Sequence, residues 1–264
     1  MIDNLQQILT KFKEPNTEIL YSMLESMRVN ELLEDVRVIQ AMRNIRIEDF
    51  ITEDMIFSVM PPDKKEYGVL IEEDVIGVLK ELFTLFYSNR PLMFYRDQTP
   101  NPPDFTRTTG APHMIAIIAQ LLDIEENDKI LILGSKSGYM ESVIQDIEIN
   151  TEAFVIEQVP EIYHITKSNI GRIKGNTNIY LGDPVYYIKN LPVSQFDKIL
   201  LTGYIKSIPK QIFDHLKIGG ILCAPVGTFY KQFFLRYFKT GEESWDEETH
   251  LPVMFSRLVT SYQN

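Results

Sequence analysis

Residues 130–138 read Ile-Leu-Ile-Leu-Gly-Ser-Lys-Ser-Gly, an apolar run that ends in a turn of small residues. Such a run, closed by glycine, is typical of a parallel strand that is buried on both faces. The small residues after it predict a tight turn into a helix, where glycines let a ligand approach the backbone. Lys136 interrupts the glycine pattern of this turn. The stretch therefore predicts an α/β fold with a ligand crevice at the carboxyl end of the strand.

The same alternation of apolar runs and amphipathic segments continues to the end of the chain. Strands are predicted at 129–133, 152–157, 177–181, 197–202 and 219–225, and helices at about 138–147, 159–172, 184–190 and 208–216. This order predicts a mostly parallel sheet with helices on both faces. Two late runs, 233–239 and 252–261, have no helix between them and predict an antiparallel pair at one edge of the sheet.

The first part of the chain has a helical pattern instead. Apolar residues recur at helical spacing in 3–12, 17–33, 33–42 and 71–87. Three prolines and an asparagine in 97–103 predict an extended loop. We therefore expect two domains, a helical N-terminal extension with a substrate-side region over 1–105 and a ligand-binding domain over 106–264.

The composition narrows the class of protein. The chain has 264 residues, 44% of them hydrophobic, a formal net charge of -11 and a single cysteine, Cys223. The hydrophobic content supports a large core, and the negative charge argues against nucleic acid and anionic membranes as partners. Because the chain has one cysteine and widely spaced histidines, we expect no disulfide within the chain and no metal site. Without a signal peptide or an apolar run near the ~20 residues that span a bilayer, we expect a cytoplasmic protein.

Three signals follow three successive predicted strands. The turn Gly134-Ser135-Lys136-Ser137-Gly138 offers backbone amides to an anionic group, although an ordinary tight turn has the same pattern. Glu157 lies about 20 residues further on, where a carboxylate accepts hydrogen bonds from two ribose hydroxyls. Asp183, in Gly182-Asp183, accepts from an adenine amine or caps the following helix. The carboxyl ends of parallel strands meet at one edge, so the three together predict a crevice for an adenosyl ligand.

A fourth segment precedes the sheet. Residues 106–114 read Thr-Arg-Thr-Thr-Gly-Ala-Pro-His-Met and join several hydroxyls to a glycine, a proline and an imidazole. Clustered hydroxyls can hold a substrate carboxylate by hydrogen bonding, whereas a lone Pro-His pair is more often packing.

These motifs, taken in order, resemble the protein-L-isoaspartate O-methyltransferase family from about Val36 to the C-terminus. Residues 108–114 resemble its Thr-Ile-Ser-Ala-Pro-His-Met motif, and residues 156–161 (Ile-Glu-Gln-Val-Pro-Glu) resemble its Ile-Glu-x-x-Pro-Glu segment. Further similar stretches are 38–42 with Phe50, 94–97, 196–202, 216–227 and 251–255. The resemblance implies a class I S-adenosylmethionine-dependent methyltransferase fold, which is Rossmann-like, with antiparallel strands at its C-terminus.

The resemblance also implies an activity. The chain would methylate carboxyl groups of isoaspartyl residues in damaged proteins or peptides, a repair reaction, with S-adenosylmethionine as cofactor. The residues implied at the methyl-transfer site are Thr108, Thr109 and Gly110. The residues implied to bind the cofactor are His113, Gly134, Ser135, Gly138, Glu157, Gln158, Gly182 and Asp183.

Four positions depart from the family pattern, and one of them is Ile115, where many members have a histidine. Gly110 replaces a serine that contacts the substrate carboxylate, Ile132 replaces an acidic residue that supports the cofactor loop, and Lys136 replaces the middle glycine of that loop. A β-carbon at position 136 would cost about 1–2 kcal/mol if the backbone there has positive φ. The chain also has an insertion at 55–90 and further residues at its start.

Three functional hypotheses follow. The first is isoaspartyl carboxyl methylation, the second a methyltransferase of the same fold with another substrate, and the third a family member that has lost catalysis and serves as a binding or assembly protein. The N-terminal helices would cover an apolar surface or join two copies of the chain into a homo-oligomer.

Overall fold

The computed structural model describes residues 4–60, 72–96, 106–172 and 175–262. The chain divides into two compact units, Met1–Ile117 and Ile118–Asn264, and each is described by itself. The loop expected at 97–103 lies outside the described residues. The domain boundary expected at 105/106 stays a prediction.

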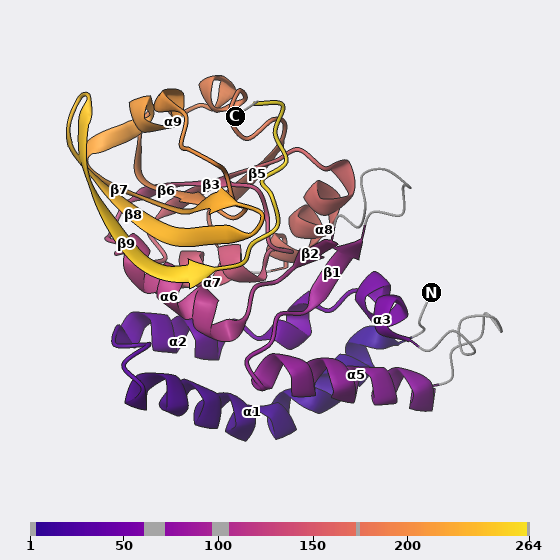
Figure 1. Cartoon of the computed structure of the whole chain (residues 1–264). Helices are drawn as coiled ribbons and strands as arrows, with labels where there is room; N and C mark the ends of the chain where they lie inside the picture. Colours follow the sequence, from indigo (N-terminus) through magenta and orange to yellow (C-terminus); the bar gives the residue numbers. More distant parts are fainter. Residues whose placement is uncertain (1–3, 61–71, 97–105, 173–174, 263–264) are drawn as a thin grey trace. The chain divides into compact units, whose positions relative to one another are not determined.

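The described residues of the first unit form helices and one pair of short strands (Figure 1). Its elements are α1 (Leu5–Val29), α2 (Val36–Asn44), the 3-10 helix η1 (Ile47–Phe50), α3 (Glu53–Val59), α5 (Glu72–Tyr87), β1 (Met93–Arg96), β2 (Thr106–Thr108) and the start of α6 (Pro112–Leu122). Helix α1 packs against α5, η1 and α2. Strands β1 and β2 pair in antiparallel register, with Tyr95 opposite Arg107.

Helix α1 corrects the expected break between residues 12 and 17. One helix runs through Pro15, although a proline removes a helical hydrogen bond. Apolar side chains are buried before and after it, among them Leu9 and Leu20, and this burial outweighs the lost bond. The helix expected over 33–42 begins later, because the side chain of Asp35 caps α2 by accepting the Arg37 amide at 2.8 Å.

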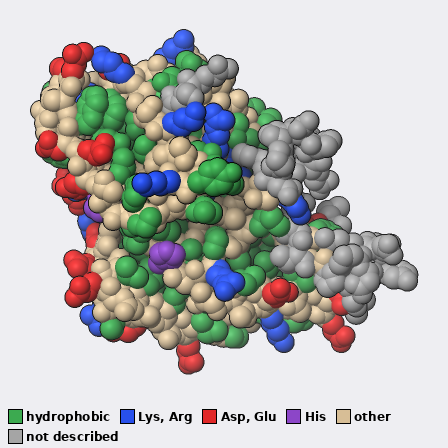
Figure 2. All heavy atoms as spheres, viewed as in Figure 1, with side chains coloured by type: hydrophobic (Ala, Val, Ile, Leu, Met, Phe, Trp, Pro, Cys, Tyr) green, Lys and Arg blue, Asp and Glu red, His purple; other side chains and the backbone are tan. Residues whose placement is uncertain are grey.

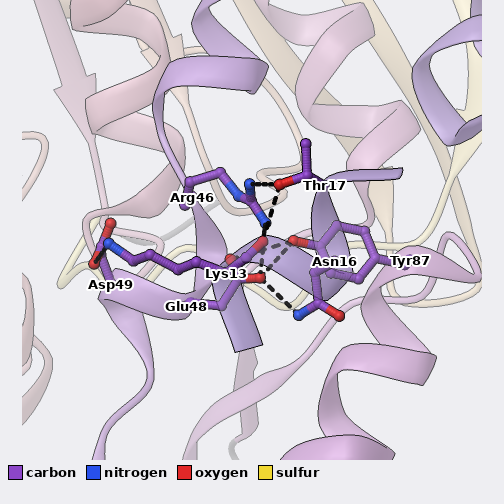
Figure 3. Close-up of polar contacts among 7 residues, drawn as sticks. All are labelled: Lys13, Asn16, Thr17, Arg46, Glu48, Asp49 and Tyr87. Carbon is purple, nitrogen blue, oxygen red and sulfur yellow. Dashed lines mark hydrogen bonds and ion pairs between the residues drawn. The ribbon is translucent and has the colours of Figure 1, made fainter. Parts of the chain in front are cut away.

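A buried carboxylate joins three elements of this unit (Figure 3). Glu48 of η1 is fully buried and accepts hydrogen bonds from Asn16 Nδ2 at 2.7 Å, Arg46 at 3.0 Å and the Tyr87 hydroxyl at 3.0 Å. Arg46 also donates to the hydroxyl of Thr17. The pKa of Arg46 is raised, since the attraction of Glu48 and Tyr87 outweighs the effect of burial. The network ties α1, η1 and α5 together.

The second unit is built on a seven-stranded sheet with the order β5-β4-β3-β6-β7-β8-β9 (Figure 1). The strands are β3 (Lys129–Leu133), β4 (Glu152–Glu157), β5 (Thr177–Leu181), β6 (Phe196–Leu201), β7 (Leu216–Thr228), β8 (Lys231–Gly241) and β9 (Ser244–Val253). The first five are parallel, and β8 and β9 add an antiparallel hairpin. The helices are α7 (Tyr139–Ile147), α8 (Pro160–Ile170) and α9 (Lys210–Asp214), with the 3-10 helix η2 (Ile188–Asn190). The mostly parallel sheet predicted from the sequence is confirmed.

Two predictions for this unit are wrong. The helix expected over 184–190 is only η2, because Asp183 accepts the Val185 and Tyr186 amides and holds a turn there. The last strand spans Ser244–Val253 instead of 252–261. Its residues are mostly polar and exposed, so no apolar run marked it.

The central strands explain why the sheet could be recognised. Successive side chains of β3 from Ile130 to Leu133 are all buried, as a strand covered on both faces requires. The edge strand β9 is the opposite, since most of its side chains are exposed. In the space-filling view, Asp and Glu side chains gather over this hairpin (Figure 2). Charge on an edge strand opposes pairing with another chain.

Candidate functional site

The turn from β3 into α7 has the conformation that its glycines suggest. Gly134 and Gly138 have φ of 84° and 89°, a region that favours glycine. Side chains of this unit also exclude a larger residue, because a β-carbon on Gly134 would lie 2.6 Å from Thr202 Oγ1. The third left-handed residue of the turn is Ser137, at φ 63°, and not Lys136. The backbone strain considered for a lysine in this turn is therefore absent at position 136.

Glu157 at the end of β4 holds the turn. Its Oε2 accepts the Ser135 amide at 2.9 Å, and its Oε1 accepts the Val159 amide at 2.8 Å. The side chain is 2% exposed. The spacing of Glu157 from the glycine turn correctly indicated that the two meet.

A second carboxylate, which the sequence interpretation missed, lies against the same turn. Glu141 of α7 is fully buried and its Oε1 accepts the Lys136 amide at 2.6 Å and the Ser135 hydroxyl at 2.9 Å. Burial raises the pKa of Glu141, against the lowering effect of these hydrogen bonds. Its Oε2 has no hydrogen-bond partner among the described residues. The available signal was its position three residues after Gly138, the residue before α7, where glutamate often caps a helix start.

Helix α8 supports the turn from the other side. The Thr166 hydroxyl makes a short hydrogen bond with the Ser135 hydroxyl, and Asn169 Nδ2 donates to the Ser137 carbonyl at 2.8 Å. Every side chain in this set is buried. The turn is therefore held by side chains of β4, α7 and α8 together.

The second unit contains two of the positions that depart from the family pattern, Ile132 and Lys136, and both are buried. Ile132 is buried in β3 between Val155 and Leu200 of the neighbouring strands, so it is part of the core. The Lys136 side chain is 3% exposed, and its Nζ lies 5.2 Å from the centroid of the Phe255 ring. This is a cation–π distance.

Asp183 follows β5 and is bonded extensively within the chain. Its two oxygens accept from the Val185 and Tyr186 amides and from both the amide and the hydroxyl of Ser261, and a fifth donor is the Thr260 hydroxyl. The pKa of Asp183 is lowered, because these bonds outweigh the effect of partial burial. Gln158, oriented with its amide nitrogen inward, donates to Val259 at 3.2 Å and Asp183 at 3.3 Å.

The predicted cofactor residues of the second unit are thus brought together. Ser135 is bonded to Glu157, the Gly182 amide donates to the Glu157 carbonyl at 2.9 Å, and Gln158 reaches Asp183. A β-carbon on Gly182 would overlap the Tyr187 ring. These residues surround the carboxyl ends of β3, β4 and β5, where ligands bind in open α/β sheets. Their roles in binding stay predictions.

The segment from Thr108 to His113 belongs to the first unit. Thr109 is buried, and its hydroxyl accepts the Leu92 amide at 3.1 Å and donates to the Gly110 carbonyl at 3.0 Å. Thr108 is partly exposed. Gly110 has φ of 88°, so a serine there would be strained, although a β-carbon would only touch Ile115 at 3.4 Å.

His113 is oriented by a loop residue. Its amide and its Nδ1 both lie 2.9 Å from Asn89 Oδ1. Because an amide oxygen only accepts, Nδ1 carries the proton and Nε2 is left as an acceptor. Burial lowers the pKa of His113, which favours the neutral ring at pH 7.

Several other kinds of site find no support among the described residues. No group of three or more His, Cys, Asp or Glu side chains is arranged to hold a metal ion. None of the described helices is both long and apolar enough to cross a membrane. Cys223 is buried, which raises the pKa of its thiol to about 12 and makes it a poor nucleophile.

Comparisons with known proteins agree on one family. Residues 58–263 match the protein-L-isoaspartate(D-aspartate) O-methyltransferase family. A protein-L-isoaspartate O-methyltransferase of Thermosipho melanesiensis is 32% identical over 200 residues, 74% of this chain and 98% of the relative. Protein-L-isoaspartate O-methyltransferase 1 of Archaeoglobus fulgidus is 32% identical over 179 residues, 66% of this chain and 82% of the relative.

A solved structure gives the same result for the fold. A candidate protein-L-isoaspartate O-methyltransferase from Plasmodium falciparum, in complex with S-adenosyl-L-homocysteine, superposes with a TM-score of 0.65 at 19% identity. The match covers 91% of this chain and 98% of that one. The class I methyltransferase fold predicted from the sequence is confirmed.

Proposed function

The chain belongs to the protein-L-isoaspartate(D-aspartate) O-methyltransferase family, and we propose that it transfers a methyl group from S-adenosylmethionine to isoaspartyl carboxylates of proteins or peptides. The observation that carries this proposal within the chain is the glycine turn anchored to Glu157, at the carboxyl ends of neighbouring parallel strands. The reaction is a protein repair step, because a methyl ester activates an abnormal carboxyl group for conversion. The proposed acceptor is a protein or peptide. We also propose that the protein is located in the cytoplasm.

The residues of the second unit fit the nucleoside part of the cofactor. Glu157 ends β4 beside the glycine turn, and carboxylate oxygens at this position can accept hydrogen bonds from ribose hydroxyls. Gly134 and Gly138 shape the loop, with Ser135 between them. Gln158, Gly182 and Asp183 would surround the adenine, and Asp183 would have to exchange one of its present donors for the adenine amine.

The chemistry asks the protein mainly to hold two reactants in place. S-adenosylmethionine supplies a methyl group activated by its sulfonium. The acceptor carboxylate is ionised at neutral pH, so no general base is needed and orientation dominates the rate. The hydroxyl of Thr109 already bonds to Leu92 and Gly110, which makes the partly exposed Thr108 the better candidate to orient the substrate.

Two measurements test this function. Calorimetry should detect binding of S-adenosylhomocysteine at micromolar or tighter dissociation constants, and a chain that fails to bind it would be left with the binding or assembly role. Methyl transfer to an isoaspartyl peptide should exceed transfer to the same peptide with normal aspartate. Binding without this preference would instead support a methyltransferase with another substrate.

A matched pair of variants tests the substrate side. Gly110→Ser and Gly110→Ala introduce the same strain at φ 88°, about 1–2 kcal/mol, but only serine adds a hydroxyl. If the substrate carboxylate is held at this position, the serine variant should methylate an isoaspartyl peptide faster than the alanine variant. Equal rates would remove residue 110 from the proposed site.

A further inference from the structure

The cofactor turn commits two of its backbone amides to side-chain carboxylates. An amide at the start of a helix after a parallel strand ordinarily remains available for an anionic group. Here the Ser135 amide donates to Glu157, and the Lys136 amide donates to Glu141. The path of the turn between Gly134 and Gly138 is therefore set by two carboxylates of the chain.

The two carboxylates come from different places. Glu157 ends the neighbouring strand, as the spacing along the sequence predicts. Glu141 comes from the first turn of α7, directly after the loop that it holds. Strand β3 contributes only apolar side chains from Ile130 to Leu133, so it offers the turn no acceptor of its own.

The burial of Glu141 calls for a reason. A fully buried carboxylate is costly unless it is bonded, and one oxygen of Glu141 accepts both hydrogen bonds while the other has no partner among the described residues. Such a group is retained where its hydrogen bonds fix something else. The only backbone amide outside its own residue that is bonded to it in the described structure is that of Lys136.

We propose that Glu141 is a positioning residue for the cofactor: its carboxylate fixes Ser135 and Lys136 in the conformation that binds S-adenosylmethionine. The effect on cofactor binding rests on the proposed function. The hydrogen bonds from Ser135 and Lys136 to Glu141 lie within the chain and can be tested without a ligand. The bond to Glu141 also explains how a lysine occupies the middle of the turn. Position 136 is held through its amide and does not need the conformational freedom of glycine.

The first test is hydrogen exchange of the cofactor-free protein. In Glu141→Ala, amides of residues 134–139 should exchange faster than in the wild type, while Glu141→Gln, which keeps an acceptor oxygen, should restore their protection. Glu148→Ala is the matched control. Glu148 directly follows the same helix at its far end and accepts the Asn150 amide at 3.3 Å, so its loss should leave the turn unchanged. Unchanged exchange in Glu141→Ala would overturn the proposal.

The second test is binding and kinetics. Glu141→Ala should weaken S-adenosylhomocysteine binding about tenfold or more and raise the KM for S-adenosylmethionine, as expected for the loss of the two hydrogen bonds that Glu141 accepts. The KM for the peptide should stay within about twofold, since only the cofactor loop changes. Glu141→Gln should recover most of the affinity. The positioning role is contradicted if Glu141→Ala raises the KM for the cofactor and the KM for the peptide equally. It is also contradicted if Glu141→Gln recovers no affinity for S-adenosylhomocysteine.

Lys136→Ala separates the amide from the ammonium. It keeps the amide that Glu141 accepts, so the turn should stay protected from exchange, and the effect of Glu141→Ala should persist in the double variant. If Lys136→Ala alone loses as much affinity as the double variant, Glu141 acts through the Lys136 charge and the proposal is wrong.

If Glu141→Ala fails to fold, Glu141→Gln decides the question. The proposal requires that this variant has the amide exchange and the cofactor affinity of the wild type. If the wild-type chain binds no S-adenosylhomocysteine, the proposed function is wrong. Hydrogen exchange of residues 134–139 in the cofactor-free protein would still test whether Glu141 holds the loop.

Discussion

Two carboxylates, Glu48 and Glu141, are fully buried, one in each unit, and they are satisfied in different ways. Glu48 accepts from three side chains, of which Arg46 carries the opposite charge (Figure 3). Glu141 accepts from a backbone amide and a hydroxyl within six residues along the chain, and one of its oxygens is unpaired among the described residues. Glu48 joins elements that are distant in sequence through Asn16 and Tyr87, whereas Glu141 bonds the adjacent loop and fixes its local path.

The two sites also differ in their relation to the family. The matched region begins at residue 58, so Asn16, Arg46 and Glu48 precede it, while Tyr87 lies within it. The network around Glu48 therefore bonds the N-terminal helices to a helix of the matched region, which makes them part of one folded unit. Glu141 also lies in the matched region, in helix α7, and it bonds a loop that departs from the family pattern at Lys136. We conclude that the helices before residue 58 are attached through the ion pair of Glu48, and that Glu141 accommodates the departure at Lys136.

The largest effect should come from breaking the paired charge. Glu48→Ala leaves the largely buried Arg46 side chain, 13% exposed, without its carboxylate, and removing one member of a buried pair costs about 3–5 kcal/mol. Thermal and urea unfolding should show this loss as a lower midpoint. Asp49→Ala is the control, because the Lys13–Asp49 pair is partly exposed and should contribute no more than about 1 kcal/mol. If the two variants unfold alike, Glu48 is not the link between the helices.

How much of this could be predicted depends on whether the signal is local. The strands at 129–133, 152–157 and 177–181 have the predicted bounds, since apolar runs closed by turns are distinctive. The link from Ser135 to Glu157 was also accessible, because strand ends of a parallel sheet meet. By contrast, Asp183 bonds Ser261 across 78 positions of sequence, and no local pattern marks such a contact. Glu141 was missed because its helix was interpreted only through its apolar face.

Asp183 offers an intermediate case, a carboxylate whose hydrogen-bond donors are all uncharged amides and hydroxyls. Asp183→Asn should cost about 1–3 kcal/mol at neutral pH, because an amide nitrogen replaces an acceptor oxygen facing the Ser261 donors. The pKa of Asp183 is lowered in the folded chain, so its contribution to stability is present above the unfolded pKa of about 3.9 and is lost as the pH falls through the folded value. Unfolding midpoints measured between neutral and strongly acidic pH should therefore fall less steeply below pH ~4 in the variant. An identical acid slope would mean that these bonds are not made in solution.

The smallest effect tests whether the turn needs a glycine at its centre. Lys136→Gly and Lys136→Ala both remove the ammonium and its contact with Phe255, so the difference between them reports on the backbone alone. Because Lys136 is not among the residues with positive φ, glycine has no conformational advantage there, and its greater freedom in the unfolded chain makes it the weaker residue. The glycine variant should be less stable than the alanine variant by about 0.5–1 kcal/mol. The opposite order in paired unfolding measurements would show that residue 136 adopts a left-handed conformation, and the support from Glu141 would then be holding a strained lysine instead of a relaxed one.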